Sequence, residues 1–597
     1  MNPAPPRVKE RSEAALHGAG RRRDPLVILR RRTADEAGAG VRRRRSGVLI
    51  LGGVLLVAAG LVLPSAWLSP VEPDAARLQG IWFFRAVSVL LGFSLVATAR
   101  AIGEEPPAKR PAALPLLPLV TLLALALVVR LIGLGSDLWY DEVVSLTEFV
   151  RLPVADLLTT YTVQNNHILY SLSAKAAIAL LGEAPAAVRL PAVLFGVASV
   201  AAVFAFGRRI ASDREALLAS ALVALSYHHV WFSQNARGYT GLMFLGVVAT
   251  ALFVDGLRER RRRLWVAYAA TFAAAMYVHL SAVFLFTCHG LVYVGLFVWG
   301  LRSPGLARQY PGARDAWPLL GFVLGGLMVL ELHALILPQM FETFGRTVGD
   351  ATALPKVSPW RSPLWTLLEA IRQLPGGFAT AAGAALGAGL GAWAWWQLMR
   401  RDPAAAWLLA LPFPLTLGTL VVAGFHIWPR YFFQYLGFAA LLLVQGAFVI
   451  VPRLPGARTR GEPWGRRAAT VLVLALIVGS AATLPANYRT PKQPFSQARE
   501  FVESNRHPGE VVVTAGLATL PYERLYAPSW SSVDDARELA GVERESRGTW
   551  LVYSFPTYME VAHEDILQAA EERYEERAVF PGTLGDGALF VWHRSGP

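Results

Sequence analysis

LIGLGSDLWYDEVVSL (residues 131–146) is the stretch around which the rest of the chain is organised. It overlaps the end of an apolar run, residues 112–134, that is long enough to cross a bilayer. An aromatic pair, Trp-Tyr, follows where such side chains favour the membrane–water boundary, and Asp141 and Glu142 come directly after it. Two adjacent carboxylates at a membrane surface indicate acid–base chemistry on a membrane-bound substrate, or, for Asp141, the cap of a following helix.

The composition is that of a polytopic membrane protein. Of 597 residues, 54% are hydrophobic, and only 17% are charged; the mean hydropathy is +0.39. The charges cluster between long apolar runs. The net charge of +14 comes largely from the amino-terminal segment and short loops, where it sets orientation, so nucleic acid is not indicated as a partner. The single cysteine, Cys288, excludes an intramolecular disulfide and suggests no thiol chemistry.

Changes in composition divide the chain into four parts. Residues 1–46 are rich in Arg, Pro, Ala and Gly, and we expect a disordered, basic cytoplasmic segment. Residues 47–110 carry two additional transmembrane helices, the first of which begins too late for a cleavable signal peptide and is predicted to be a signal anchor. Residues 111–486 form the membrane core, and residues 487–597 have the composition of a soluble domain.

Apolar runs predict about thirteen transmembrane helices. Fourteen candidates occur, at 48–69, 80–101, 112–134, 167–181, 189–206, 216–231, 241–257, 264–279, 281–300, 316–337, 378–399, 405–426, 432–451 and 468–485. An amino terminus inside and a carboxy-terminal domain outside require an odd number, so one candidate does not cross. Residues 167–181 are favoured as the partial one because they are short; residues 216–231 are the alternative.

Loop charge predicts the orientation. The basic loop RERRRR (residues 258–263) is expected in the cytoplasm, with the amino terminus. Asp141, Glu142 and the carboxy-terminal domain then lie on the periplasmic side of a multi-pass inner (plasma) membrane protein. The long loop 338–377 is expected on the same side, partly irregular, with an amphipathic surface helix in LWTLLEAIRQL.

The carboxy-terminal domain is predicted to be a small α/β domain. Residues 510–515, 549–555 and 588–594 have the pattern of strands, and residues 560–576 that of a helix. It has neither G-x-G-x-x-G nor a P-loop, so we assign it no nucleotide.

Polar side chains recur at span ends on the predicted outer side. They are Asn166, His167, Arg237, Tyr239, His279, Arg430 and Tyr431. Polar groups near membrane depth are costly unless they are paired or hydrated, so their shared side suggests a shared cavity. Taken singly, a histidine such as His279 more often serves helix packing than catalysis, and Arg430 is equally consistent with an interfacial anchor.

The ordered motifs resemble polyprenyl-phosphate-sugar glycosyltransferases of the GT-C superfamily, in particular the protein O-mannosyltransferase and lipid A aminoarabinose transferase branch. They are LWYDEVVS, NNHILYSLSAKAAIALLG, VRLPAVLFGVASVAAVFAFGRR, SQNARGYT and PRYFF. The resemblance spans residues 112–482 and excludes residues 1–110. The chain departs from the family at His167-Ile168-Leu169, where the family commonly has His-x-Pro or Pro-Pro, and at Asn235, where bacterial members often carry an acidic residue.

The resemblance implies transfer of a sugar from a polyprenyl-phosphate donor to an acceptor hydroxyl with inversion. Asp141 would be the general base, while Glu142 would orient the acceptor or hold a divalent cation. We assign no required cofactor. The leaving phosphate needs cations and hydrogen-bond donors. The expected phosphate-binding residues are Arg237, Arg430, Tyr239 and Tyr431, and the other cavity residues are Asn166, His167 and His279.

Two other classes of function fit parts of the sequence. A transporter or flippase of a lipid-linked or anionic substrate would use the same charges along a path, although we find no inverted repeat. A non-catalytic scaffold would bind a periplasmic partner through its carboxy-terminal domain. The sequence leaves open the sugar, the isoprenoid length and whether the acceptor is a glycan, a lipid or a protein.

Overall fold

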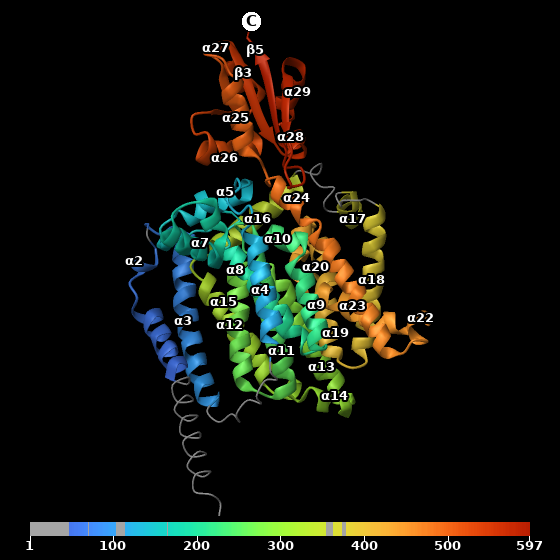
Figure 1. Ribbon diagram of the computed structural model, residues 1–597. Coiled ribbons are helices and arrows are strands. Elements are labelled where there is room, and N and C mark those ends of the chain that lie inside the picture. Colours follow the sequence, from blue (N-terminus) through green and yellow to red (C-terminus); the bar gives the residue numbers. More distant parts are fainter. Residues whose placement is uncertain are drawn as a thin grey trace, which may run out of the picture.

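The computed structural model describes residues 47–69, 71–102, 114–163, 165–353, 362–372 and 378–596. The basic segment 1–46 and the loop EEPPAKR, both expected in the cytoplasm, lie outside these residues. A bundle of helices carries a small sheet-containing domain at one end, and the chain ends in that domain (Figure 1). The predicted class, a mainly helical multi-pass membrane protein with a small carboxy-terminal α/β domain, is confirmed.

Six helices of the described residues are long and apolar enough to cross a membrane. They are α3 (Ala75–Ile102), α8 (Pro185–Gly207), α11 (Tyr239–Glu259), α13 (Ala282–Arg302), the continuous stretch Pro429–Arg453 and the stretch Glu462–Arg489. The last two contain η5 (Pro429–Tyr435) with α21 (Leu436–Ile450) and η6 (Val451–Arg453), and α23 (Glu462–Ala481) with α24 (Leu484–Arg489).

Three further pairs of apolar helices meet at a sharp bend, and if each pair is one span the described residues contain nine candidate spans. The pairs are α9 (Asp213–Ala224) with α10 (Tyr227–Ser233), bent by 62°, α15 (Trp317–His333) with the start of α16 (Leu337–Ala353), bent by 84°, and α19 (Pro403–Ala410) with α20 (Pro412–Val422), bent by 42°. Three shorter apolar helices are Gly47–Val62, α4 (Leu116–Leu131) and α7 (Ile168–Leu181). The count of thirteen therefore stays a prediction.

Two predicted elements need correction. Residues 216–231 are not one continuous helix, because the Ser226 hydroxyl accepts a hydrogen bond from the His229 N–H and starts a new helix there. In the loop 338–377, the segment 347–365 that we expect to be irregular is helical at its start, because α16 (Leu337–Ala353) extends into it, and residues 354–361 lie outside the described residues. The predicted surface helix is present as α17 (Pro363–Arg372).

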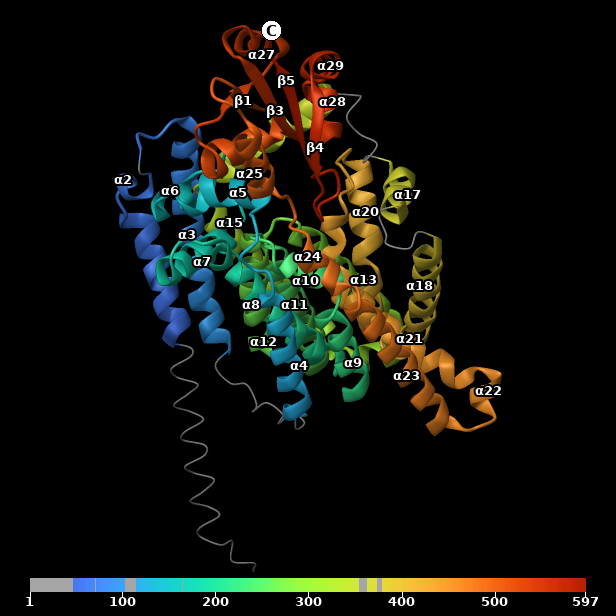
Figure 2. The same cartoon turned by 45° about the horizontal axis from the view of Figure 1, so that its top comes forward.

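The remaining helices complete the bundle and its two ends. They are α2 (Ser65–Leu68), α5 (Tyr140–Ser145), the π-helix η1 (Leu146–Val150), α6 (Val154–Thr159), α12 (Arg262–Val278), α14 (Pro304–Gln309), the 3-10 turn η2 (Pro311–Arg314), α18 (Phe378–Met399) and α22 (Pro455–Arg458). In Figures 1 and 2, α5 lies at the end that carries the carboxy-terminal domain, as α6 does in Figure 2, whereas α22 lies away from that domain.

The carboxy-terminal domain contains one five-stranded sheet in the order β2-β1-β3-β5-β4. Its strands are β1 (Val511–Ala515), β2 (Ser531–Val533), β3 (Gly548–Ser554), β4 (Glu575–Phe580) and β5 (Leu589–Ser595). The first three are parallel, and β5 is antiparallel to both β3 and β4. The three predicted strands are confirmed. The predicted helix 560–576 is instead divided between two helices and the start of β4, whose residues are largely exposed and so lack a clear apolar alternation.

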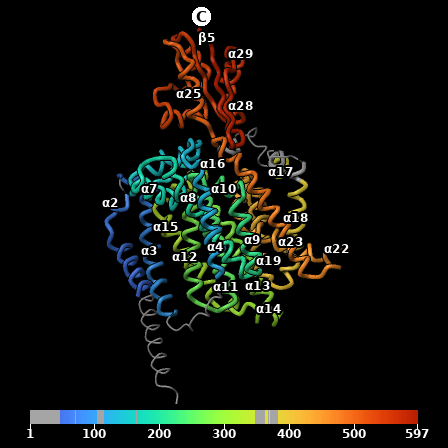
Figure 3. The backbone as a smooth tube through the Cα atoms, viewed as in Figure 1, coloured from blue at the N-terminus to red at the C-terminus, as the bar shows by residue number. Residues whose placement is uncertain are grey.

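Helices cover both faces of the sheet. On one face, α25 (Phe495–Asn505) packs its apolar side against β1, β3 and β5, together with η8 (Tyr522–Tyr526). On the other face lie α27 (Ala536–Glu545), α28 (Pro556–Ala562) and α29 (Glu564–Arg573). The short turns η7 (Gly516–Ala518) and α26 (Thr519–Pro521) follow β1. The backbone trace in Figure 3 shows α25 on one flank of the sheet, with α28 and α29 on the other.

Candidate active site

The acidic motif, Asp141 and Glu142, lies on α5, a short helix at the end of the bundle that carries the carboxy-terminal domain (Figure 1). Glu142 is at its third position, and its Oε2 accepts a hydrogen bond from the Trp139 N–H at 3.2 Å. The two adjacent carboxylates have different surroundings. The Asp141 side chain is 11% exposed, whereas Glu142 is fully buried.

Glu142 forms a buried ion pair with Arg189 of α8. Arg189 donates from Nε to Glu142 Oε1 at 2.8 Å and from Nη2 to Oε2 at 2.6 Å. The Ala236 N–H donates to the same Oε1 at 2.5 Å. Burial raises the pKa of Glu142, but the Arg189 guanidinium and these hydrogen bonds outweigh it and bring the pKa below its ordinary value.

This environment does not suit a cation at Glu142. Both of its oxygens already accept hydrogen bonds, and its nearest charge is a guanidinium. Among the residues that the structure describes, no group of three or more His, Cys, Asp or Glu is placed to share a metal ion. The contacts give Glu142 a positioning role within the fold, and its expected role in orienting the acceptor stays a prediction.

Arg189 also fixes the backbone that leads into α5. Its Nη1 donates to the carbonyls of Leu134 and Ser136 at 2.9 and 2.8 Å, and its Nη2 to that of Asp137 at 2.7 Å. The sequence analysis did not single out this residue. The available signal was an arginine close to the start of an apolar helix, which is costly unless it is paired.

Asp141 lies between two arginines from distant parts of the chain. Its Oδ2 is 3.4 Å from Nη1 of Arg430 in η5 and 3.9 Å from Nη2 of Arg237. Asn165 donates to Oδ1 at 3.4 Å. The Arg430 side chain is 36% exposed, but that of Arg237 is only 3% exposed. Arg430 is therefore the cation that an incoming anion reaches first.

Arg237 is held by residues of the QNNHILY segment. Its Nη2 donates to Asn165 Oδ1 at 2.6 Å and lies 3.4 Å from His167 Nε2. The other ring nitrogen of His167 accepts from the Gly238 N–H at 2.8 Å. A side chain at Gly238 would meet the Val278 carbonyl oxygen at 2.4 Å, so this approach requires glycine.

The structure brings most of the other predicted residues together. The ring of His167 is 4.4 Å from that of His279 and 5.7 Å from that of Tyr239, centre to centre. The guanidinium of Arg237 lies 5.9 Å from the centre of the Tyr239 ring. Tyr431 follows Arg430 in η5 and is partly buried.

Several buried polar atoms around this cluster have no partner among the described residues. They are both amide atoms of Asn166, Arg237 Nε, Asn235 Nδ2 and Gln434 Oε1. Buried polar groups are nearly always hydrogen-bonded, so this concentration indicates a site that binds water or a ligand.

The carboxy-terminal domain is docked directly on the acidic motif. The Tyr140 N–H donates to Gln493 Oε1 at 2.9 Å, and Gln493 in turn donates to Ser554 Oγ at 3.0 Å. The carboxylate of Asp137 accepts from the backbone N–H and the hydroxyl of Ser496 at 2.7 and 2.8 Å. The domain therefore contacts the backbone at the start of α5, a connection that the sequence did not reveal.

Lys492 joins the same interface to the SQNARGY segment. Its buried ammonium donates to the Gln234 carbonyl and lies 5.1 Å from the centre of the Trp231 ring. Burial lowers the pKa of Lys492 to about 7, although Glu142 acts in the opposite direction. The sequence analysis did not identify this lysine.

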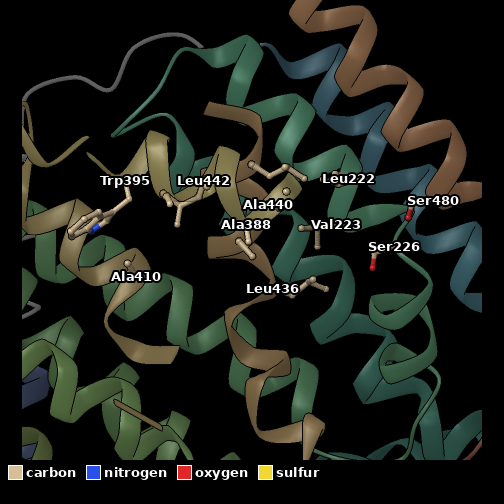
Figure 4. A pocket seen from close by; sticks show the side chains of 15 residues that line it. Leu222, Val223, Ser226, Ala388, Trp395, Ala410, Leu436, Ala440, Leu442 and Ser480 are labelled. Carbon is tan, nitrogen blue, oxygen red and sulfur yellow. The ribbon is translucent and has the colours of Figure 1, made fainter. Parts of the chain in front are cut away.

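An apolar pocket of about 670 Å³ lies in the membrane part, between α9, α18, α21 and α23 (Figure 4). Leu222, Val223, Ala388, Trp395, Ala410, Leu436, Ala440 and Leu442 are among its lining side chains, and Ser226 and Ser480 lie at one edge. Leu436 directly follows η5, which carries Arg430. A flexible hydrocarbon chain fits such a lining.

Solved structures similar to this chain include two of one protein and one of another. ArnT from Cupriavidus metallidurans in the apo state is 15% identical, with a TM-score of 0.45 over 79% of this chain and 97% of that one. The same protein bound to undecaprenyl phosphate is 14% identical, with a TM-score of 0.43 over the same shares. Archaeal oligosaccharyltransferase AglB from Archaeoglobus fulgidus, in complex with an inhibitory peptide and a dolichol-phosphate, is 11% identical, with a TM-score of 0.45 over 79% of this chain and 74% of that one. No residue role is transferred from these structures.

No curated protein sequence matches the chain. A family model does match, over residues 167–303, and its description is dolichyl-phosphate-mannose-protein mannosyltransferase. The matched part includes His167, Arg237, Tyr239 and His279 and ends before Arg430. Over that part of its membrane core the chain is thus similar to glycosyltransferases that use a lipid-phosphate-linked sugar, as the ordered motifs of the sequence predicted.

Proposed function

We propose that this protein transfers a sugar from a polyprenyl-phosphate donor to an acceptor hydroxyl, with Asp141 as the general base. The observation that carries the proposal is the position of one carboxylate, partly exposed, between Arg237 and Arg430. A base and a phosphate-binding cation are thereby available within a few ångströms of each other. The family match supports a lipid-phosphate donor.

In the proposed reaction the donor phosphate binds the exposed guanidinium of Arg430. This replaces the long contact with Asp141 and leaves that carboxylate free to face the acceptor. Asp141 takes the proton of the acceptor hydroxyl as its oxygen attacks the anomeric carbon from the side opposite the phosphate. The bond from that carbon to the phosphate oxygen breaks, and its electron pair leaves with the lipid phosphate. A single displacement of this kind inverts the anomeric centre.

The cations act on the charge that develops during this step. The donor is a phosphodiester with one negative charge, and the product is a phosphate monoester that gains a second. The fork of Arg430 matches phosphate oxygens geometrically, and buried Arg237 adds positive potential in a region shielded from water. Glu142 is already hydrogen-bonded at both oxygens and paired with Arg189, so no step of the proposed reaction uses a metal ion.

The apolar pocket supports a polyprenyl carrier. Its lining is almost entirely hydrocarbon, and Leu436 connects it to the helix that bears Arg430. We propose that the isoprenoid tail occupies this pocket while the phosphate stays at the arginines. The acceptor would then approach from the side of the carboxy-terminal domain.

A transporter or flippase would need polar groups along a path between the two membrane faces. The predicted site residues instead gather at the domain end of the bundle, at the ends of helices. This distribution favours transfer chemistry at one face.

We further propose that this face is periplasmic, with the amino terminus in the cytoplasm. A reporter enzyme fused after the last residue should be active in the periplasm, and one inserted between Arg260 and Arg261 in the cytoplasm. Activity of both reporters in the same compartment would contradict this orientation.

Turnover tests the function directly. The purified protein is incubated with polyprenyl phosphate carrying a radiolabelled sugar and with extracts of cell-envelope acceptors. We expect release of free polyprenyl phosphate together with labelled acceptor of inverted anomeric configuration. Transport of intact donor across proteoliposomes without cleavage would establish the alternative.

A further inference from the structure

A second pocket, which has a polar lining, lies at the end of the bundle away from the carboxy-terminal domain. It has a volume of about 560 Å³ and is formed where α8, α18 and α21 end and where α9 and α23 begin. α21 starts beside Arg430 and ends at this pocket, and its 15 residues span about 22 Å. The pocket is therefore separate from the proposed active site.

Arginine dominates the charged lining. Arg209, Arg401, Arg453 and Arg466 line the pocket, together with the carboxylates of Glu215 and Glu462. Arg209 is paired with Asp255 at 2.7 Å, and Arg466 is 3.8 Å from Glu462. Arg401 and Arg453 have no carboxylate partner among the described residues.

Gln445 provides an independent observation. It lies within α21, lines the pocket and is only 4% exposed. Its amide nitrogen has no hydrogen-bond acceptor in the part of the chain that the structure describes. A buried donor without an acceptor is costly, and an oxyanion supplies the acceptor that it lacks.

The neighbouring surface indicates a lipid. On α23, five and eight residues beyond Arg466, two apolar side chains are exposed: Val471 is 66% and Leu474 46% exposed. A phospholipid could lay its acyl chains along this face with its phosphate between the arginines. Basic pockets between transmembrane helices bind anionic headgroups in this way.

We propose that this pocket binds the phosphate of an anionic phospholipid headgroup, at the membrane face opposite the transfer site. Arg401 and Arg453 contact its oxygens, and Gln445 donates a further hydrogen bond. The proposal is independent of the sugar-transfer reaction, because no residue of that site takes part.

Delipidated full-length protein in detergent is titrated with phosphatidylglycerol, phosphatidylcholine or inorganic phosphate, and bound lipid is counted by native mass spectrometry. The test variant is Arg401→Gln/Arg453→Gln. The matched control is Arg302→Gln/Arg308→Gln, which removes two exposed arginines from α13 and α14 that do not line the pocket.

We expect the protein to prefer phosphatidylglycerol to phosphatidylcholine. The test variant should bind phosphatidylglycerol on the order of 10- to 30-fold more weakly, from the usual contribution of two arginines near a membrane surface. The control should bind as the unaltered protein does. Equal weakening in both variants, or no weakening in the test variant, overturns the proposal. Displacement of the lipid by inorganic phosphate at comparable concentration overturns the lipid as the ligand.

Discussion

Replacing Asp141 by asparagine separates chemistry from folding at this site. The amide keeps the oxygen that accepts from Asn165 at 3.4 Å, and the contacts to Arg237 and Arg430 are long, at 3.9 and 3.4 Å. Little structural stabilisation is therefore lost. The proton acceptor is removed, so the rate of sugar transfer should fall by about 10²- to 10⁴-fold. Donor affinity should change little.

Glu142→Gln is the matched control, because it makes the same chemical change one residue away. Glu142 is fully buried and receives two hydrogen bonds from Arg189 and one from the Ala236 N–H. A glutamine would leave the buried guanidinium of Arg189 without a counter-charge. Its amide N–H group would also face a hydrogen-bond donor, either the Arg189 guanidinium or a backbone N–H. Loss of one partner of a buried ion pair typically costs about 3–5 kcal/mol. This variant should lose thermal stability as well as activity.

Both variants are purified in the same detergent and compared by melting temperature, donor binding and single-turnover transfer of a labelled sugar. The reasoning requires a folded Asp141→Asn protein that binds donor and does not react. If that protein, with an unchanged melting temperature, retained more than about a tenth of the transfer rate, Asp141 would not be the base.

Three further outcomes follow from the same contacts. In a titration with polyprenyl phosphate, Arg430→Lys should bind measurably more weakly, and Arg430→Ala should lose about 1.5–3 kcal/mol of binding free energy. If Arg430 were only an interfacial anchor, lysine would replace it without loss of binding. Gln493→Ala should lower kcat with little change in donor affinity, because the Tyr140 N–H of α5 loses its hydrogen-bond acceptor. The control Glu500→Ala, on the exposed side of α25, should leave kcat unchanged. Equal effects of the two substitutions would argue against positioning of α5 by the carboxy-terminal domain. Lys492 has a pKa of about 7 in the folded protein and 10.5 in the unfolded chain, so between these pH values the unfolded state binds more protons and stability rises with pH. The melting temperature of the unaltered protein should therefore rise relative to that of Lys492→Met from pH 7 to 10. A constant difference between the two would refute the lowered pKa of Lys492.

The sequence alone determined the class of the protein and supplied several residues of the candidate site. Long apolar runs and basic loops are local properties, and they predicted a multi-pass helical core with an α/β domain after it. Motifs at span ends supplied Asp141, Arg237 and Arg430, which the structure brings together across as many as 289 residues. Local patterns also located α17 and three strands of the sheet.

Only the tertiary structure distinguished Asp141 from Glu142. The two residues are neighbours with the same functional group, and their difference arises from Arg189, 47 residues further along the chain. The docking of Gln493 and Ser496 on the acidic motif, and the bend between α9 and α10, depend likewise on contacts between distant segments. Sequence periodicity predicts which residues are buried, since burial depends on each residue and its near neighbours in the chain. It does not report which buried charge meets which partner, because pairing is decided by the packing of whole helices.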